Sequence, residues 1–527
     1  MNKVYNTVWN ESTGMWVVTS ELTRKGGRRP RQIRRTALAG LIAGLLLPSA
    51  PALATYDENQ TLESGGKSSS MRLSAGDTAT NPTINNGHQY VSNGSSATGT
   101  TINSGGHQYI FSGGSATSTT INSGGNQYVS SGGSATGTTI NSRGYQHVSS
   151  GGSATSTTIN SGGEQYVSSG GSATSTTINS GGYQFVSSGG SATGTTINSG
   201  GMLSIFGGSA VDITQKSGGG ISTDTSATLS GTNINGSFSI AGGSASNMLL
   251  ENGGYLAVLN GHQATSTTIN SGGLQRVSSG GSATGTTINS GGMLSIFGGS
   301  AVDITQKSGG GISTDTSATL SGTNINGSFS IAGGSASNML LENGGYLAVL
   351  NGHQATSTTI NSGGLQRVSS GGSATGTTIN SGGHQYVNSS GSATGTTING
   401  SGYQFVSSGG SATGTTINGS GYQYIFSGGS ATSTTINSGG NQYVSSGGSA
   451  TSTTINSGGY QYVNSSGSAT GTTINGSGYQ FVSSGGSATG TTINGSGYQY
   501  IFSGGSATST TINSGGNQYV SSGGSAT

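Results

Sequence analysis

The sequence has 527 residues, of which 104 are glycine, 29% are apolar and 5% are charged, and it contains no cysteine. Its length would otherwise predict roughly three or four globular domains, but this composition is too poor in apolar residues for such cores and excludes disulfides. Eight of the 15 basic residues lie within the first 54 positions, which leaves seven basic and 11 acidic residues in the rest. We therefore expect no nucleic-acid partner, because no basic surface remains to bind phosphates.

The first predicted element is a secretory signal peptide. Residues 37–47, ALAGLIAGLLL, are apolar or small, and they follow a basic run at residues 28–35. Small residues at positions 52–54 predict cleavage between Ala54 and Thr55. The apolar stretch is too short to span a bilayer. Residues 1–54 are therefore expected to direct export and to be removed.

Upstream of the apolar stretch, residues 1–21 read MNKVYNTVWNESTGMWVVTSE and contain both tryptophans of the chain. This segment resembles the extended signal-peptide region of large autotransporters and related type V secreted proteins. The resemblance implies export through the periplasm to the outer membrane and cell surface, with extracellular release as an open alternative. It also implies a C-terminal translocator barrel, and we expect the 527 residues to stop before it.

A 19-residue unit repeats after residues 55–81, which are irregular and are expected to form an N-terminal cap or a linker. Residues 134–152 read SATGTTINSRGYQHVSSGG, and the next unit reads SATSTTINSGGEQYVSSGG. Runs rich in Thr, Ile, Tyr and Val alternate with NSGG and SSGG, which are strand and turn signals. A period of 19 is near that of solenoid coils. The pattern predicts an all-β fold, a parallel β-helix (β-solenoid) with one unit per coil.

Each position of the unit becomes a ladder if coils stack about 4.8 Å apart. Three ladders are predicted to point inward: the Ile of TTIN, the Ala of SAT, and the Val or Ile that ends the QYV run. Successive strand residues point to opposite faces, so the residue before that Val points outward. This outward row, our candidate contact surface, consists of Tyr90, Tyr109, Tyr128, His147, Tyr166 and Phe185. The alternative is that these rings only cover one another along the rod.

Two larger duplications divide the repeat region. Residues 202–292 recur unchanged as residues 293–383, and residues 385–451 recur as residues 461–527. The 91-residue block is more apolar and less regular than the coils around it. We therefore expect 19-residue coils over residues 82–201, two 91-residue β-helix blocks over 202–383, and 19-residue coils over 384–527.

The repeated unit SAT[GS]TTINSGGxQYVSSGG, together with the extended signal region, resembles AIDA-type self-associating autotransporter adhesins over essentially the whole chain. The resemblance implies a right-handed β-helical passenger that mediates bacterial autoaggregation, biofilm formation, and adhesion to or invasion of epithelial cells. The partners it implies are passengers on neighbouring cells and the epithelial host-cell surface.

The same resemblance implies O-linked heptose on serines of the repeats. The implied partner is a cytoplasmic heptosyltransferase that uses ADP-heptose. The acceptors would fall among turn serines such as Ser123, Ser130, Ser131 and Ser134, and the sequence does not choose between them.

No catalytic residue, metal site or cofactor is predicted, and the chain is not expected to be an enzyme. Catalysis on a β-helix needs acids, bases or metal ligands clustered on neighbouring coils. The acids of the block, Asp212, Asp224 and Glu251, are sparse. The coil histidines His88, His107 and His147 are interpreted as surface residues rather than metal ligands.

Two other non-enzymatic functions remain open. One is a passive stalk that only holds another part of the protein away from the membrane. The other is an ice-binding or surface-ordering solenoid, because Thr136 and Thr138 recur on successive coils as a regular hydroxyl array. Asn-x-Ser sequons such as Asn399-Gly400-Ser401 are expected from the composition alone.

Overall fold

The computed structural model describes residues 5–10, 15–20, 58–65 and 69–527, with side chains from residue 58 onward. It divides into two units, Met1–Ala52 and Leu53–Thr527. Every regular element in these described ranges is a β-strand. No helix there is long and apolar enough to cross a membrane.

The first unit contains a single described hairpin. Strands β1 (Tyr5–Asn10) and β2 (Met15–Ser20) pair antiparallel, with Trp9 opposite Trp16 in the register. The predicted cleavage site at Ala54 and Thr55 and the apolar stretch before it lie outside the described residues.

The second unit is built from coils of three short strands each. In a representative coil these strands are β13 (Asn126–Val129), β14 (Ser134–Thr136) and β15 (Thr139–Ile140). The β-branched and aromatic residues lie in the strands, and the Gly- and Ser-rich runs lie in the turns between them, as their propensities favour.

Left-handed backbone conformations at fixed positions make the turns. Between β13 and β14, Ser131 and Gly132 have φ values of 47° and 78°, the signs that a type I′ turn requires at both central residues. Gly137, between β14 and β15, has φ of 67°. Glycine adopts these angles without the Cβ clash that other residues meet, which explains why these positions hold Gly, Ser or Asn.

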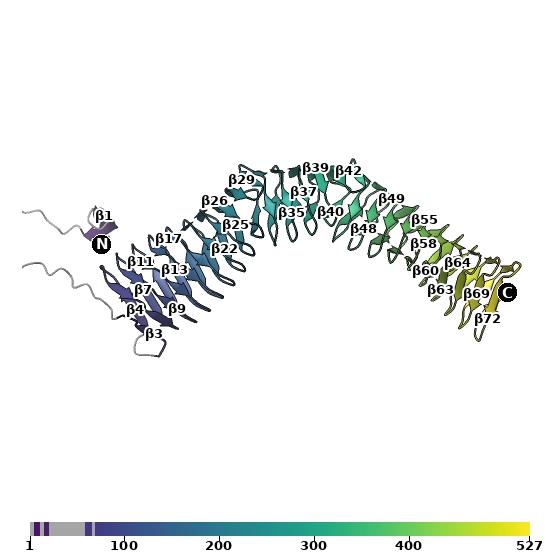
Figure 1. Ribbon diagram of the computed structural model, residues 1–527, viewed down its shortest axis with the longest axis horizontal. Coiled ribbons are helices and arrows are strands. Elements are labelled where there is room, and N and C mark those ends of the chain that lie inside the picture. Colours follow the sequence, from purple (N-terminus) through teal and green to yellow (C-terminus); the bar gives the residue numbers. More distant parts are fainter. Residues whose placement is uncertain (1–4, 11–14, 21–57, 66–68) are drawn as a thin grey trace, which may run out of the picture. The chain divides into compact units, whose positions relative to one another are not determined.

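Successive coils stack in register through parallel strands. β13 lies between β10 (His107–Ile110) and β16 (Tyr145–Val148), with partner residues 19 positions apart. This pairing runs from β4 (Ser70–Leu73) to β72 (Asn517–Val520) as one 23-stranded sheet, whose arrows lie side by side in Figure 1. The predicted parallel β-solenoid of about 19 residues per coil is thus confirmed.

Close stacking also explains the last glycine of each SSGG turn. A Cβ on Gly133 would lie 2.3 Å from the carbonyl oxygen of Ile110 in the preceding coil. Its neighbour Gly132 meets no atom closer than 4.0 Å, and in other coils Ser390 and Ser466 occupy this position. Only the last glycine is therefore required by the contact between coils.

The three predicted inward ladders form the core. Val129, Ala135 and Ile140 are at most 1% exposed, and equivalent residues are buried in coil after coil. Two polar residues complete the interior of the coil, since Gln127 and Thr138 are equally buried. The core is therefore part apolar and part polar.

The buried glutamines form a continuous hydrogen-bonded ladder within each run of 19-residue coils. The Nε2 of Gln127 donates to Oε1 of Gln108 at 2.7 Å, and Gln146 donates in turn to Gln127 at 2.6 Å. The Thr138 hydroxyl also donates to the Gln127 oxygen, at 3.2 Å. These bonds supply partners for amides that would be costly to bury alone.

A second amide ladder runs along the corner that follows the TI strands. Here Asn122 Nδ2 donates to Asn103 Oδ1 at 2.9 Å, and Asn141 donates to Asn122 at the same distance. We call this row the asparagine ladder. Its side chains are only partly buried, so it marks an edge of the solenoid.

The solenoid already begins within the segment expected as a cap or linker, residues 55–81. Its described part contains β3 (Thr61–Glu63), β4 and β5 (Thr78–Thr80), which pair in parallel with the three strands of the next coil. The buried side chains of this coil are Leu62, Met71, Leu73 and Ala79.

The 91-residue blocks contain an antiparallel insertion that the repeat pattern does not predict. Strands β28 (Thr228–Asn233) and β29 (Gly236–Ala241) form a hairpin, and β30 (Ser244–Ser246) pairs antiparallel with β29. The second block repeats it as β41 (Thr319–Asn324) and β42 (Gly327–Ala332). One sheet thus gains an extra strand in each block.

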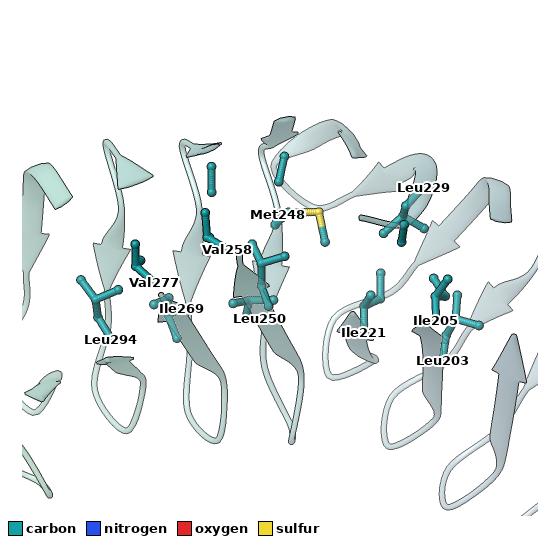
Figure 2. Packing of buried hydrophobic residues seen from close by; sticks show 14 of the residues in the cluster. Leu203, Ile205, Ile221, Leu229, Met248, Leu250, Val258, Ile269, Val277 and Leu294 are labelled. Atoms are coloured by element: carbon teal, nitrogen blue, oxygen red, sulfur yellow. The ribbon is translucent and has the colours of Figure 1, made fainter. Parts of the chain in front are cut away.

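In the irregular part of each block, apolar residues take the core position that glutamine holds in the regular coils, while Gln275 and Gln366 keep it elsewhere in the blocks. Leu203 pairs in register with Gln184, so the glutamine ladder ends there. Figure 2 shows the replacement core, in which aliphatic side chains such as Leu203, Ile205 and Ile221 project from neighbouring strands into the interior.

Candidate functional site

The predicted outward residues form a continuous stack of rings on the face of the 23-stranded sheet. We call this row the aromatic ladder. Ring centroids of neighbouring residues lie 4.9–5.1 Å apart with interplanar angles of 9–12°. Its first stretch consists of Tyr90, Tyr109, Tyr128, His147, Tyr166 and Phe185. The structure therefore brings all the predicted ladder residues together.

A second stretch of the aromatic ladder follows the blocks. Its centroids are 4.7–5.3 Å apart, and its members are Tyr386, Phe405, Tyr424, Tyr443, Tyr462, Phe481, Tyr500 and Tyr519. Between the two stretches, Ser, Ala and Arg residues take the place of rings, as at Ser204 and Arg276. The blocks thus separate two aromatic surfaces.

A flanking row lies beside the ladder and was not singled out from the sequence. It starts each strand of the sheet, two residues before the ladder residue, and it varies more in residue type. In its aromatic parts, Tyr403 stacks on Tyr422 at 5.1 Å and lies 6.1 Å from Phe405 of the ladder. The period of two along a strand would have identified it, because both residues share the outer face.

Stacking determines which part of each ring meets solvent. The rings lie nearly parallel and one above another along the coil axis, so their faces are covered by neighbours. Edges and hydroxyl groups remain accessible, and the side chains are mostly half-buried. The ladder therefore presents an amphipathic ribbon of edges and hydroxyls, rather than free ring faces.

An arginine precedes each stretch of the ladder. The Arg72 guanidinium lies 4.3 Å from the centroid of the Tyr90 ring, which has no ring on that side. Arg367 occupies the register position before Tyr386. The cation over Tyr90 covers the terminal ring face through a cation–π contact.

The packing of the ladder shifts the pKa values of its titratable groups. Burial, together with a hydrogen bond from its hydroxyl to the Glu164 carboxylate, raises the pKa of Tyr166 to about 12. Burial lowers the pKa of His147 below its usual value, against the opposing charge of Glu164. In the flanking row, burial and the neighbouring His88 both lower the pKa of His107. The ladder therefore favours neutral side chains.

The candidate glycosylation serines lie in turns on both sides of the ladder strand. Ser123 precedes β13 and Ser131 follows it, and both are exposed. Ser130 is half-buried in the same turn as Ser131, and Ser134 is half-buried in β14. The structure thus separates two freely accessible hydroxyls from two partly covered ones.

The prediction that Thr136 and Thr138 form one regular hydroxyl array is wrong. Thr136 is exposed, whereas Thr138 is 1% exposed and donates its hydroxyl to Gln127. The left-handed corner at Gly137 lies between the two residues and reverses the alternation, so that they do not share a face. Because Thr138 points inward, the Thr136–Thr138 array that supported the ice-binding alternative is not formed.

The sparse acids of the blocks make local structural contacts. Oε1 of Glu251 accepts the N–H of Gly218 at 2.5 Å, and Oε2 accepts from Asn270 at 2.9 Å. Asp224 accepts from the N–H of Ser226 at 2.8 Å. Among the described residues, no group of three or more His, Asp or Glu side chains could hold a metal ion.

Taken together, these features define a class: a repeat-built parallel β-solenoid whose surface carries ordered rows of side chains. Five segments match the AIDA family model, "Adhesin of bacterial autotransporter system, probable stalk", and together they make up half of the chain: residues 102–163, 150–201, 230–292, 321–383 and 379–421. The chain belongs to this family. Residues 1–50 match the extended signal peptide of the type V secretion system, which confirms the sequence-based interpretation and supports export to the bacterial cell surface.

Two curated relatives match shorter stretches. The chain is 85% identical over 87 residues to the autotransporter CRAC of Citrobacter rodentium and 76% identical over 92 residues to the autotransporter adhesin/invasin TibA of Escherichia coli O78:H11. These matches cover 16% and 17% of this chain, and only 6% and 9% of the relatives. The predicted resemblance to AIDA-type autotransporter adhesins is thus confirmed, with TibA among the relatives, and membership of an adhesin family indicates a structural or adhesive role.

One solved structure is also similar. It is a TibC-catalysed hyper-glycosylated fragment of TibA, with 34% sequence identity and a TM-score of 0.30 over 89% of this chain and 98% of the fragment.

Proposed function

We propose that the chain is a surface-exposed autotransporter passenger whose aromatic ladder mediates self-association between bacterial cells, leading to autoaggregation and biofilm formation. The observation that carries this proposal is the long ladder, whose ring edges and hydroxyls are accessible, on coils that are almost free of charge. Residues 384–527 contain no Asp, Glu, Lys or Arg at all.

Physical reasons favour contact between two such ladders. Edges and hydroxyls of Tyr can pack against each other with little loss of side-chain entropy, because stacking already fixes the rings. Each coil contributes weakly, but many coils engage together once two parallel rows align. Neither surface has to desolvate a charge or overcome like-charge repulsion.

Clumping of cells that display the full protein tests the proposal. We expect replacement of Tyr424, Tyr443, Tyr462 and Tyr500 by Ser to reduce clumping strongly. The fold should tolerate the change, because Ser204 and Ser295 occupy the same row in the blocks. A matched control replaces exposed Thr residues of the SAT strands by Ser on the same number of coils.

A passive stalk is the second candidate, and the description of the matching family as a stalk favours it. Under that function the ladder variants would clump as well as the parent, with equal amounts of protein on the cell surface. Unchanged clumping would therefore contradict self-association through the ladder and support the stalk function.

We further propose adhesion to and invasion of epithelial cells, and O-linked heptose added by a cytoplasmic heptosyltransferase that uses ADP-heptose. The similarity to TibA supports both, since TibA is named an adhesin/invasin and its fragment is glycosylated by TibC. Among the candidate serines, exposure favours Ser123 and Ser131 over Ser130 and Ser134.

Intact-mass measurement of protein made with and without the transferase tests the modification. We expect increments of single heptoses only with the transferase. Site mapping should find sugar on serines at the exposed turn positions, and sugar confined to half-buried serines would contradict the assignment.

A further inference from the structure

The Asn-x-Ser sequons of the solenoid fall into distinct structural classes. From β4 onward there are nine of them, beginning at Asn93, Asn235, Asn326, Asn388, Asn399, Asn418, Asn464, Asn475 and Asn494. Such a sequon accepts an N-linked sugar only where the asparagine amide and the hydroxyl two residues later are accessible on the surface. The structure shows where both conditions hold.

Four of the sequons belong to the asparagine ladder. Asn399 donates from Nδ2 to Asn380 at 3.3 Å and accepts from Asn418 at 3.1 Å, and Asn475 and Asn494 repeat this arrangement. A sugar on such a nitrogen would have to fit between coils that lie about 4.8 Å apart. These side-chain amides are therefore already engaged in hydrogen bonds between coils.

In three further sequons, the asparagine side chain or the serine hydroxyl is covered for other reasons. The Ser95 hydroxyl of the Asn93 sequon is 1% exposed and donates to the Leu73 carbonyl at 3.0 Å. Asn388 has a buried Oδ1, and it is only half-exposed, as is its duplicate Asn464. In each of the three, at least one of the two groups is partly or fully covered.

The remaining two sequons lie at the tips of the inserted hairpins. Asn235 and Ser237 are exposed at the turn between β28 and β29, next to Ile234, which is 62% exposed. The backbone N–H of Asn235 donates to the side chain of Asn233 at 2.8 Å, while the side-chain amide of Asn235 makes no hydrogen bond to the described residues. The same tip recurs at Asn326 and Ser328.

We propose that Asn235 and Asn326 are acceptor sites for N-linked sugar, transferred from a donor in which the sugar is activated by a diphosphate. In the step, Nδ2 of Asn bonds to the anomeric carbon, the bond from that carbon to the diphosphate oxygen breaks, and Nδ2 loses one proton. The hairpin tip projects the amide away from the stacked coils, so the sugar meets no neighbouring ladder. This modification is separate from O-linked heptose on turn serines.

In vitro transfer to the folded full-length chain tests the proposal. The probe is UDP-glucose with a bacterial N-glycosyltransferase of the soluble, nucleotide-sugar type, and the readout is intact mass followed by peptide mapping. From β4 onward we expect two hexoses, both on tip peptides, and peptide mapping counts the exposed Asn59-Gln60-Thr61 sequon before β3 separately. Because the two tips have identical sequences, single Ser237→Ala and Ser328→Ala variants should each leave one hexose on residues 70–527, and the double variant none.

The heat-unfolded chain is the control for the transferase. If the enzyme modifies the sequons of the asparagine ladder in the unfolded chain, their protection in the folded chain is due to the structure and not to their sequence. Hexose on the Asn399 or Asn475 class in the folded chain, at a level equal to the tips, would overturn the proposal. So would unlabelled tips in the folded chain with an enzyme that labels the unfolded one. Heptose on serines has a different mass and attachment atom, so the two modifications succeed or fail independently.

Discussion

At the scale of single residues, the buried Gln and Thr of the regular coils show how hydrogen bonds between coils supply partners for amides in a polar core. Gln127 accepts from the next glutamine and from Thr138, and donates to the preceding glutamine. Loss of one glutamine removes hydrogen bonds from the glutamines before and after it. Burying polar groups with fewer partners costs more free energy than a single hydrogen bond contributes.

Gln146→Leu should therefore destabilise its coil, although Leu occupies the equivalent position in the blocks. We expect a loss of about 1–3 kcal/mol, because the Gln127 oxygen and the Gln165 amide each lose one hydrogen bond and the Thr157 hydroxyl loses its acceptor. Hydrogen exchange of the YQHV peptide, which occurs once in the chain, measures the local effect. Equal exchange in the variant and the parent, with Ser149→Ala as the surface control, would contradict the prediction.

The aromatic ladder should lose stability at alkaline pH. Tyr166 has a pKa raised from 10.0 to about 12, so the folded state holds its proton more tightly than the unfolded state. Its contribution is complete below pH 10 and is lost as the pH rises through about 12. Difference titration of tyrosinate absorbance between the parent and Tyr166→Phe measures this pKa.

Glu164→Gln should lower the pKa of Tyr166 toward its ordinary value, because the carboxylate that accepts its hydrogen bond and repels its anion is removed. Burial remains, so a part of the shift should persist. An unchanged titration in this variant would show that Glu164 does not contribute.

At the scale of the coil, the turns fix the distance between neighbours. The last glycine of SSGG lies against the carbonyl of the preceding coil, whereas the glycine before it faces open space. The two positions look equivalent in the sequence, and only the stack of coils distinguishes them.

Gly133→Ala should separate two coils and destabilise them by about 1–3 kcal/mol, the usual cost of overpacking. Gly132→Ser is the matched control, since Ser390 and Ser466 take this conformation naturally with φ of 63° and 64°. Limited proteolysis of the secreted chain compares the two. Equal resistance of both variants would show that the coils can shift to accept the methyl group.

Periodicity and strand alternation were sufficient to predict the solenoid, the inward Val, Ala and Ile ladders and the outward rings. The same alternation puts Gln127 on the inner face with Val129, but its hydrogen bonds depend on the neighbouring coils and could not be derived from one unit. Thr138 was assigned wrongly because a left-handed corner interrupts the alternation at Gly137. The hairpin of the blocks was not anticipated, because TNINGS reads as one more turn.

At the scale of the whole chain, the distribution of charge distinguishes the regular coils from the blocks. From residue 69 onward, all Lys, Asp and Glu residues except Asp77 and Glu164 lie in the blocks, while the second stretch of the aromatic ladder lies on coils without charge. An association between such coils has no ionic component for salt to screen.

Clumping through the ladder should therefore be nearly constant between low and high ionic strength at neutral pH. Settling rates of displaying cells in buffers of increasing salt concentration test this. A steep decrease with salt would point instead to ion pairs formed by the charged residues of the blocks.

Parallel stacking with a spacing of 19 residues also bears on how such a long chain can fold outside the cell. Each new coil needs only the edge of the coil beside it, so no segment has to search for a distant partner. A chain that emerges gradually through a pore can add one turn at a time onto a finished template. Each added turn then makes backward sliding less favourable, so that the free energy of folding itself can draw the polypeptide outward.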